Sequence, residues 1–162
     1  MKIYLGNDDS YSSNLSYAHK YAKLGWAVFP IYQIEEGACS CPLGKNCKSP
    51  GKHPRTKTGL KEATTNKEAI DAWWDAYPNA NIGIRTGPES GIWVLDVDID
   101  HDNGKLGDDS LWELQDLNEK LPSTVEAITG GGGRHLFFKY PTNQVIKSGT
   151  NVICENLDIR GV

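Results

Sequence analysis

Asp96, Asp98 and Asp100 stand at every second position of the stretch GIWVLDVDID. The apolar residues around them predict a β-strand, in which alternate side chains point to the same face. Carboxylates held about 6.6 Å apart along a strand repel each other unless a cation lies among them. Hard cations such as Mg2+ and Mn2+ bind carboxylate oxygens and keep positions open for phosphate oxygens. The Asp-x-Asp pair of Asp96 and Asp98 is therefore a candidate catalytic metal site.

Two other interpretations of these acids compete with the metal pair. The first is that they are solvated side chains at the end of a strand, and the motif alone does not separate that interpretation from a metal site. The second is a calcium loop, which needs glycine at its sixth position and glutamate at its twelfth. Counted from Asp98, those positions hold Asn103 and Asp109, so an EF-hand loop is excluded.

Residues suited to binding phosphate follow further along the chain. The stretch TGGGGRHLFF places Gly130–Gly133 directly before a predicted strand, and glycine lets backbone N–H groups come close to phosphate oxygens. Arg134 and His135 are adjacent, so they point to opposite faces and only one of them can reach a bound phosphate. A hydrogen-bonded core histidine is the alternative for His135. In NLDIRG, Asp158 and Arg160 share a face, which supplies a third carboxylate with a cation beside it.

A second group of potential metal ligands lies in CSCPLGKNCKSPGKH. Cys39, Cys41, Cys47 and His53 have the spacing C-x-C-x5-C-x5-H, and three thiolates with one imidazole satisfy tetrahedral Zn2+. Four protein ligands leave no position for water, so the predicted role is structural. The alternative is a set of unligated thiols in a flexible loop. Cys154 stands apart in an apolar run and is expected in the core.

The same stretch concentrates positive charge. The chain has 17 basic and 21 acidic residues, a formal net charge of −4, which by itself argues against a nucleic-acid partner. Residues 37–61 nevertheless contain no acidic residue and six basic ones: Lys45, Lys48, Lys52, Arg55, Lys57 and Lys61. An acidic body with one basic arm is compatible with binding to a nucleic-acid backbone. A solvated loop that carries lysines for solubility is the simpler alternative.

Helices and strands must position these groups. Apolar spacing, capping residues and breakers predict helices over residues 15–24, 64–78 and 108–122, the last capped by Asp108 to Ser110 and ending before Pro122. β-branched and aromatic runs predict strands at 26–32, 81–87, 91–100, 124–129, 134–140 and 156–162. The turn GPESG joins the second and third strands, and interleaved helices and hairpin-like strand pairs predict an α+β domain with a mixed or mostly antiparallel sheet. No stretch has the ~20 apolar residues of a membrane helix and no secretory signal precedes the domain, so we expect a cytoplasmic protein with no membrane partner.

These pieces, in this order and spacing, resemble the bifunctional primase–polymerase (Prim-Pol) family of the archaeo-eukaryotic primase superfamily. The resemblance rests on AKLGWAVFPIY, GKHPRTKTGLKEATTNKEAIDAWWDAYPNANIGIRTG, SGIWVLDVDID, LPSTVEAITGGGGRHLFFKY and LDIRG. It implies a modified RNA-recognition-like (RRM-like) core flanked by helices. The family domain usually continues past DIRG with another glycine-rich strand region. We therefore expect a single catalytic domain over residues 1–162, shortened at its C-terminus, with residues 37–61 as its zinc-binding insert.

The resemblance also implies functional residues. Asp96, Asp98 and Asp158 correspond to the ligands of two catalytic Mg2+ or Mn2+ ions, and His135 to a contact of the incoming triphosphate. Lys52 in GKHP and Arg85 in NIGIRTG lie in family-like motifs and are expected to contact nucleotide or template. The expected nucleotide-binding set is His135, Gly131, Gly132, Gly133, Arg160, Arg85 and Lys52.

The implied activity is template-directed nucleotidyl transfer by a DNA primase/polymerase. The expected partners are a DNA template and primer, a dNTP or NTP, and a helicase fused to the chain or encoded nearby, in the replication of a plasmid, phage or other mobile element. The alternative is a non-catalytic module that binds nucleic acid or nucleotide and recruits a replicative helicase. A nuclease of a related initiator fold is disfavoured, because the chain has no H-x-H pair for a two-histidine metal site.

Overall fold

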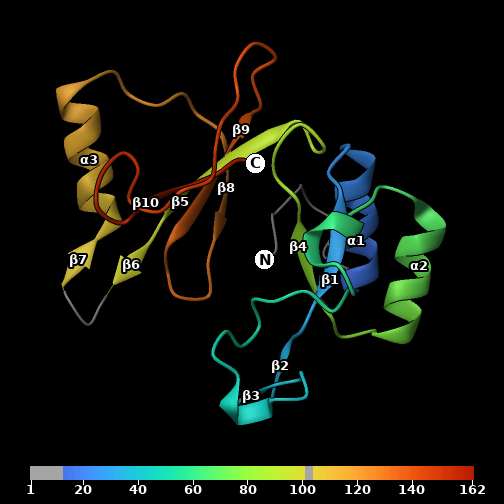
Figure 1. The fold of residues 1–162 in the computed structure, drawn as a ribbon. Helices are drawn as coiled ribbons and strands as arrows, with labels where there is room; N and C mark the ends of the chain where they lie inside the picture. The colour runs from blue at the N-terminus through green and yellow to red at the C-terminus, as the bar shows by residue number, and fades with distance from the viewer. Residues whose placement is uncertain (1–12, 101–103) are drawn as a thin grey trace. The chain divides into compact units, whose positions relative to one another are not determined.

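Residues 13–100 and 104–162 are described by a computed structural model of the chain (Figure 1). They fall into two compact units, residues 13–85 and residues 86–162. The first unit contains α1 (Asn14–Lys23), β1 (Val28–Ile31), β2 (Ile34–Glu35), β3 (Ala38–Cys39), two 3-10 turns (Gly44–Asn46 and Gly59–Glu62), α2 (Lys67–Ala76) and β4 (Asn81–Ile84). The second contains β5 (Ile92–Val97), β6 (Ile99–Asp100), β7 (Lys105–Leu106), α3 (Gly107–Leu117), β8 (Val125–Ile128), β9 (Arg134–Lys139) and β10 (Leu157–Arg160).

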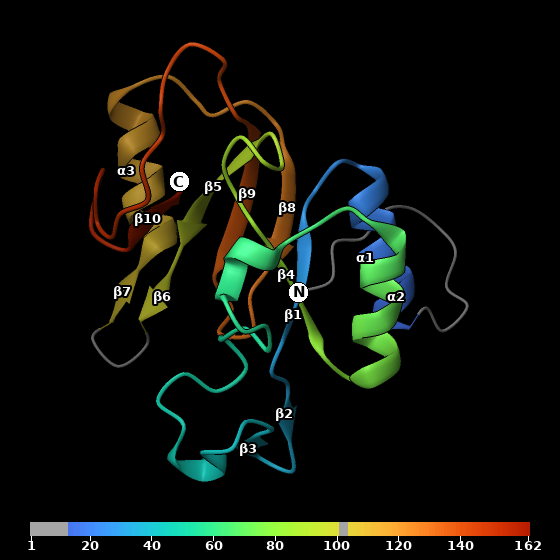
Figure 2. The ribbon, with the colours of Figure 1, turned by 45° about the vertical axis from the view of Figure 1, so that its right-hand side comes forward.

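In the first unit, two helices pack beside a two-stranded ribbon (Figure 2). Ser13 and Asn66 cap α1 and α2, because their side-chain oxygens accept backbone N–H groups of the first helical turn. β1 pairs antiparallel with β4, and Pro30 lies opposite Ile82. Ile70 and Trp74 of α2 are buried, as the apolar stripe of the predicted helix requires.

After β1 the chain forms β2 and β3, and the insert of residues 37–61 then returns along the side of β1. On its return, the N–H of Arg55 donates to the carbonyl of Pro30 at 2.9 Å, and the N–H of Tyr32 donates to the carbonyl of His53 at 3.1 Å. Pro30 has no N–H to donate, and only its carbonyl takes part in this pairing. The root of the insert is thus joined to β1 by backbone hydrogen bonds.

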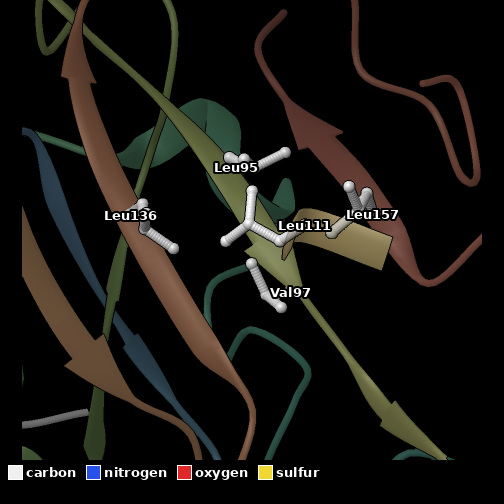
Figure 3. Packing of buried hydrophobic residues seen from close by; sticks show 5 residues of the cluster. All are labelled: Leu95, Val97, Leu111, Leu136 and Leu157. Carbon is white, nitrogen blue, oxygen red and sulfur yellow. The ribbon is translucent and has the colours of Figure 1, made fainter. Parts of the chain in front are cut away.

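The second unit is built on a four-stranded antiparallel sheet in the order β10-β5-β9-β8. α3 packs on one face, where Leu111 meets Leu95, Val97, Leu136 and Leu157 in the core (Figure 3). Cys154 packs against this cluster, as predicted. Residues 146–149 run beside β10 through a bridge between Gly149 and Ile159, while β8 forms the other edge of the sheet. All strand pairs among the described residues are antiparallel, in agreement with the α+β prediction.

The long strand predicted over residues 91–100 is interrupted. β5 ends at Val97, and β6 begins after Asp98. At the interruption the N–H of Asp98 donates to the carbonyl of Asn156 at 3.0 Å, and its carbonyl accepts from the N–H of Gly107 at 2.8 Å. The N–H of Asp98 thus continues the register in which Val97 lies opposite Leu157, whereas its carbonyl turns away to Gly107.

Two further expectations are corrected. The third helix begins at Gly107, is preceded by Leu106 with no side-chain cap, and ends at Leu117, so the predicted cap and the extension to Pro122 are wrong. Gly107 lies so close to Asp98 that a Cβ there would be 2.5 Å from the Asp98 carbonyl oxygen, and this approach determines where the helix starts. The predicted turn GPESG closes with one antiparallel bridge between Gly87 and Ile92, but the strands that it joins do not form a longer hairpin, because β4 pairs with β1 and β5 pairs with β9 and β10.

Among the residues that the structure describes, no helix has the length and apolar character needed to span a bilayer.

Candidate active site and zinc site

Three polar side chains form a row across the second sheet. In the strand register, Asp158 of β10 lies opposite Asp96 of β5, and Asp96 lies opposite His135 of β9. Directly opposed residues of antiparallel strands present their side chains on the same face about 4.5–5.5 Å apart. Leu95 and Val97 alternate with Asp96 and face α3. The row therefore lies on the face of the sheet opposite to α3.

Asp96 is the centre of the row. Its side chain is only 8% exposed, and its Oδ1 lies 3.1 Å from Nε2 of His135. Its Oδ2 accepts two hydrogen bonds from Arg160, from Nε at 3.1 Å and from Nη2 at 2.9 Å. Within residues 13–100 and 104–162, Oδ1 receives no hydrogen bond of good geometry. A buried carboxylate oxygen without a donor is suited to binding a cation.

Asp158 is held from two directions. Its Oδ1 accepts the backbone N–H of Asn151 at 2.8 Å, and its Oδ2 accepts from Nη2 of Arg160 at 2.9 Å. Sequence reasoning missed the contribution of Asn151. Asn151 and Asn156 both have left-handed backbone conformations, with φ of 53° and 62°, and asparagine in a Gly- and Asn-containing loop is the one signal that pointed to such a turn.

Asp98 is exposed and lies just beyond the end of β5. One carboxylate oxygen each from Asp96, Asp98 and Asp158 lies within 4.8 Å of the others. Three hard oxygen donors at this spacing, one of them on a buried acid with an oxygen that lacks a donor, fit a divalent cation. The structure thus brings together the three predicted acids and His135. The side chain of Asp100 is not among those the structure describes.

The electrostatics of the row come from the chain itself. Burial raises the pKa of the Asp96 carboxyl, but His135 and Arg160 outweigh it and hold that pKa below its usual range. Burial alone would lower the pKa of the Arg160 guanidinium. The hydrogen bond to Asp96 and the charges of Asp96 and Asp158 outweigh burial and raise that pKa. Asp96 is therefore ionised at neutral pH, with positive groups already beside it.

The glycine-rich stretch forms a tight turn next to Asp98. The N–H of Thr129 donates to the carbonyl of Gly133 at 2.8 Å, and the N–H of Gly132 donates to the carbonyl of Thr129 at 3.1 Å. A Cβ at Gly133 would lie 2.4 Å from the carbonyl oxygen of Val97, so only glycine lets the turn come this close to the end of β5. Gly130 and Gly131 are exposed, with open space where a side chain would be.

Arg134 points to the opposite face from His135, as predicted. Its Nη2 pairs with Asp108 in the first turn of α3, and its Nη1 lies 3.3 Å from Glu126 of β8. Arg134 therefore connects α3, β8 and β9 behind the row. His135, of the two adjacent residues, is the one on the face of the acids.

The four predicted zinc ligands converge in the first unit. One donor atom each from Cys39, Cys41, Cys47 and His53 lies within 4.8 Å of the others. Nε2 of His53 is 3.5 Å from the sulfur of Cys39 and 3.4 Å from that of Cys47. Zn–S bonds of about 2.3 Å and Zn–N bonds of about 2.0–2.1 Å at tetrahedral angles place sulfur and nitrogen about 3.6 Å apart. The donor set and its spacing therefore fit structural zinc.

The thiols differ in acidity. Burial raises the pKa of Cys39, but hydrogen bonds from the backbone N–H groups of Gly51 and Cys41 and from His53 lower it to about 6. Burial and the neighbouring thiols raise the pKa of Cys47. Cys39 is thus a thiolate at neutral pH, the form in which cysteine binds metal.

Aromatic rings pack against Arg55, close to the point where the insert meets β1. The guanidinium of Arg55 lies 4.6 Å from the ring centre of Tyr32 and 4.0 Å from that of Tyr77. The ring of His53 lies 4.8 Å from the ring of Tyr32. Of the two other predicted nucleotide contacts, Lys52 is exposed on the insert and Arg85 follows β4. Both belong to the first unit, and their roles remain predictions.

Comparison with known proteins gives one match. A family model described as "Bifunctional DNA primase/polymerase, N-terminal" matches residues 18–162. No curated protein and no solved structure matches the chain. The family match covers far more than half of the 162 residues and includes all three acids, His135 and the four candidate zinc ligands. The chain therefore belongs to the bifunctional DNA primase/polymerase (Prim-Pol) family, which implies DNA and nucleotide substrates and nucleotidyl transfer as its general chemistry.

Proposed function

We propose that this chain is a template-directed DNA primase/polymerase that uses two divalent ions, Mg2+ or Mn2+. The proposal extends to residues 1–162 forming a single catalytic domain on a modified RRM-like core. One observation carries it: Asp158, Asp96 and His135 are consecutive cross-strand neighbours in a four-stranded sheet. Because the three residues are far apart in the sequence, their alignment on one face supports a common function.

Asp96, Asp98 and Asp158 are the proposed ligands of the ions. The three carboxylates can supply hard oxygen donors at the spacing that such ions need. When bound, the ions supply charge stabilisation for phosphoryl transfer and lower the pKa of the attacking 3′-hydroxyl.

The nucleotide-binding residues act on the triphosphate. His135 and Arg160 carry donors next to the acids, and both can be directed at phosphate oxygens. The backbone at Gly131, Gly132 and Gly133 is proposed to approach the phosphates where no side chain intervenes. Arg85 and Lys52 are proposed as contacts to the nucleotide or the template.

The insert, folded around zinc, is proposed to bind the template strand. Zinc would order residues 37–61, whose six basic and no acidic residues can attract a phosphate backbone. The proposed setting is replication of a plasmid, phage or other mobile element together with a helicase, which the family resemblance suggests.

Primer extension tests the activity. Purified chain with a labelled primer–template, dNTPs and Mn2+ should extend the primer, and Asp96→Asn, Asp98→Asn and Asp158→Asn should each reduce the rate about a hundredfold or more. The matched control is Asp116→Asn, which removes an exposed acid of α3. DNA binding in an anisotropy assay should survive all four substitutions. Binding without incorporation by the unmodified chain, tested with dNTPs and NTPs, would instead support the non-catalytic helicase-recruiting module.

A further inference from the structure

Arg160 lies between two of the acids that are proposed to bind ions. Its Nη2 donates to Asp96 Oδ2 and to Asp158 Oδ2, each at 2.9 Å, and its Nε donates to Asp96 Oδ2 at 3.1 Å. One guanidinium therefore bridges both carboxylates. A divalent ion bound to Asp96 Oδ2 and Asp158 Oδ2 would compete with Arg160 for these oxygens.

The oxygens of the row differ in how far they are engaged. Both oxygens of Asp158 accept hydrogen bonds, one from Asn151 and one from Arg160. Asp96 Oδ2 accepts two bonds from Arg160, whereas Asp96 Oδ1 accepts none of good geometry from the part of the chain that the structure describes. An ion at Asp96 Oδ1 would therefore meet Nε2 of His135, 3.1 Å from that oxygen, rather than Arg160. A second ion at Asp158 must compete with it.

Arg160 has the properties of a group that can move between two anions. Its side chain is 45% exposed, while those of Asp96 and Asp158 are 8% and 5% exposed. A guanidinium within a few ångströms of a divalent ion is strongly repelled by it. Its fork of donors matches phosphate as well as carboxylate, so an arriving triphosphate offers it a second anionic partner.

We propose that Arg160 is a resident counter-ion that makes loading of the second ion depend on nucleotide. Without nucleotide it bridges Asp96 and Asp158; with nucleotide it transfers its hydrogen bonds to the triphosphate and releases Asp158 Oδ2 for an ion. This inference rests on the proposed function, since it assigns the order of assembly at the same site. No covalent bond changes in the exchange, in which one positive group replaces another beside the carboxylates.

Manganese titration followed by electron paramagnetic resonance tests the inference, with zinc-loaded protein. The unmodified chain should bind one Mn2+ tightly without nucleotide and two with a non-hydrolysable deoxyadenosine triphosphate analogue. Arg160→Gln should bind two ions without the analogue, the second at least about tenfold more tightly than the unmodified chain does, because a positive charge has left the site. Arg160→Lys, which keeps the charge, should retain the dependence on nucleotide.

Two results would overturn the inference about Arg160 while leaving the proposed function intact. If Arg160 only supported the fold, Arg160→Gln would lower the melting temperature and bind Mn2+ equally or less tightly, which would overturn the inference. Two tight ions on the unmodified chain without nucleotide would overturn it as well, even if Arg160→Gln failed to fold. In both cases Asp96→Asn should still abolish binding, and the proposed function survives. If Mn2+ bound no form of the chain, or Asp96→Asn changed nothing, both proposals would fail.

Discussion

At the scale of single residues, Asp96 depends on the groups on either side of it. A buried carboxylate without partners would be strongly unfavourable, and Arg160 and His135 provide positive or hydrogen-bonding groups at 2.9–3.1 Å. The row is therefore stable as part of the folded chain, although Oδ1 of Asp96 accepts no well-aligned hydrogen bond from the described residues.

Gly133 should be required for the close approach of the glycine turn to Asp98. We expect Gly133→Ala to destabilise the chain by about 1–3 kcal/mol, because its Cβ would lie 2.4 Å from the Val97 carbonyl and the backbone must shift. Urea unfolding measures the free energy. Mn2+ affinity should fall in parallel, since Asp98 follows Val97 directly.

Gly130→Ala is the control for this prediction. Nothing lies within 4 Å of a Cβ at Gly130, so its free energy of unfolding should change by no more than about 0.5 kcal/mol. Equal stabilities for the two variants would show that the close approach is absent in solution.

Sequence reasoning went far for these residues and then stopped for a physical reason. The period of two in a strand was enough to predict that Arg134 and His135 lie on opposite faces, and the family resemblance pointed to His135 as the one beside the acids. It could not predict that the strand is interrupted at Asp98, because the interruption depends on the bond between the Asp98 carbonyl and the N–H of Gly107. Nor could it predict that one guanidinium bridges Asp96 and Asp158, which follows from side-chain conformation across two strands.

At the scale of elements, α1 and α2 are joined by a pair that sequence patterns do not reveal. Nε2 of His19 lies 2.7 Å from Oδ1 of Asp71. The side chains of Lys67 and then His19 hold the pKa of the Asp71 carboxyl below its usual range. The ionised form of Asp71 is therefore favoured by folding, and the pair stabilises the packing of the two helices.

This stabilisation should depend on pH. Because the folded pKa of Asp71 is depressed, its contribution is present above the unfolded pKa of roughly 3.9 and is lost as pH falls through the folded pKa. Asp71→Asn should lower the urea midpoint at pH 7, and the difference from the unmodified chain should shrink below about pH 4. Asp75→Asn, on the exposed side of α2, is the control. A difference that stayed constant down to pH 3 would contradict the assignment.

Elements were easier to predict than their partners. Most helices and strands were correctly placed, since apolar periodicity and caps are local signals. The pairing of β4 and β5 was wrong because a strand's sequence does not specify which edge it joins. The start of α3 was wrong because Gly107 serves a close approach to Asp98 rather than a cap.

At the scale of the whole molecule, charge is divided between the two units. Residues 13–85 carry ten basic and six acidic residues, whereas residues 86–162 carry six basic and thirteen acidic ones. The unit with the four candidate zinc ligands thus has the sign of charge that attracts a phosphate backbone. The unit with the acid row has the sign that attracts divalent cations.

Zinc removal should separate the two roles. Cys47→Ser should lower the zinc content measured by mass spectrometry, weaken binding to single-stranded DNA, and make the dependence of affinity on salt shallower, because fewer basic residues are held in place. Mn2+ binding at the acid row should be unchanged. Cys154→Ser, which removes a thiol outside the ligand group, should keep the zinc. Loss of Mn2+ binding before loss of DNA binding would contradict this division.

The two borders of the second sheet are unequal. Residues 146–149 cover β10, while no strand among residues 13–100 and 104–162 pairs with the outer side of β8. β8 also presents Val125 at 42% and Ile128 at 75% exposure. An uncovered border recruits further extended chains. Crowded solutions should therefore favour self-association that begins at β8 and spares the side carrying Asp158 and Arg160, so early aggregates would retain an accessible acid row.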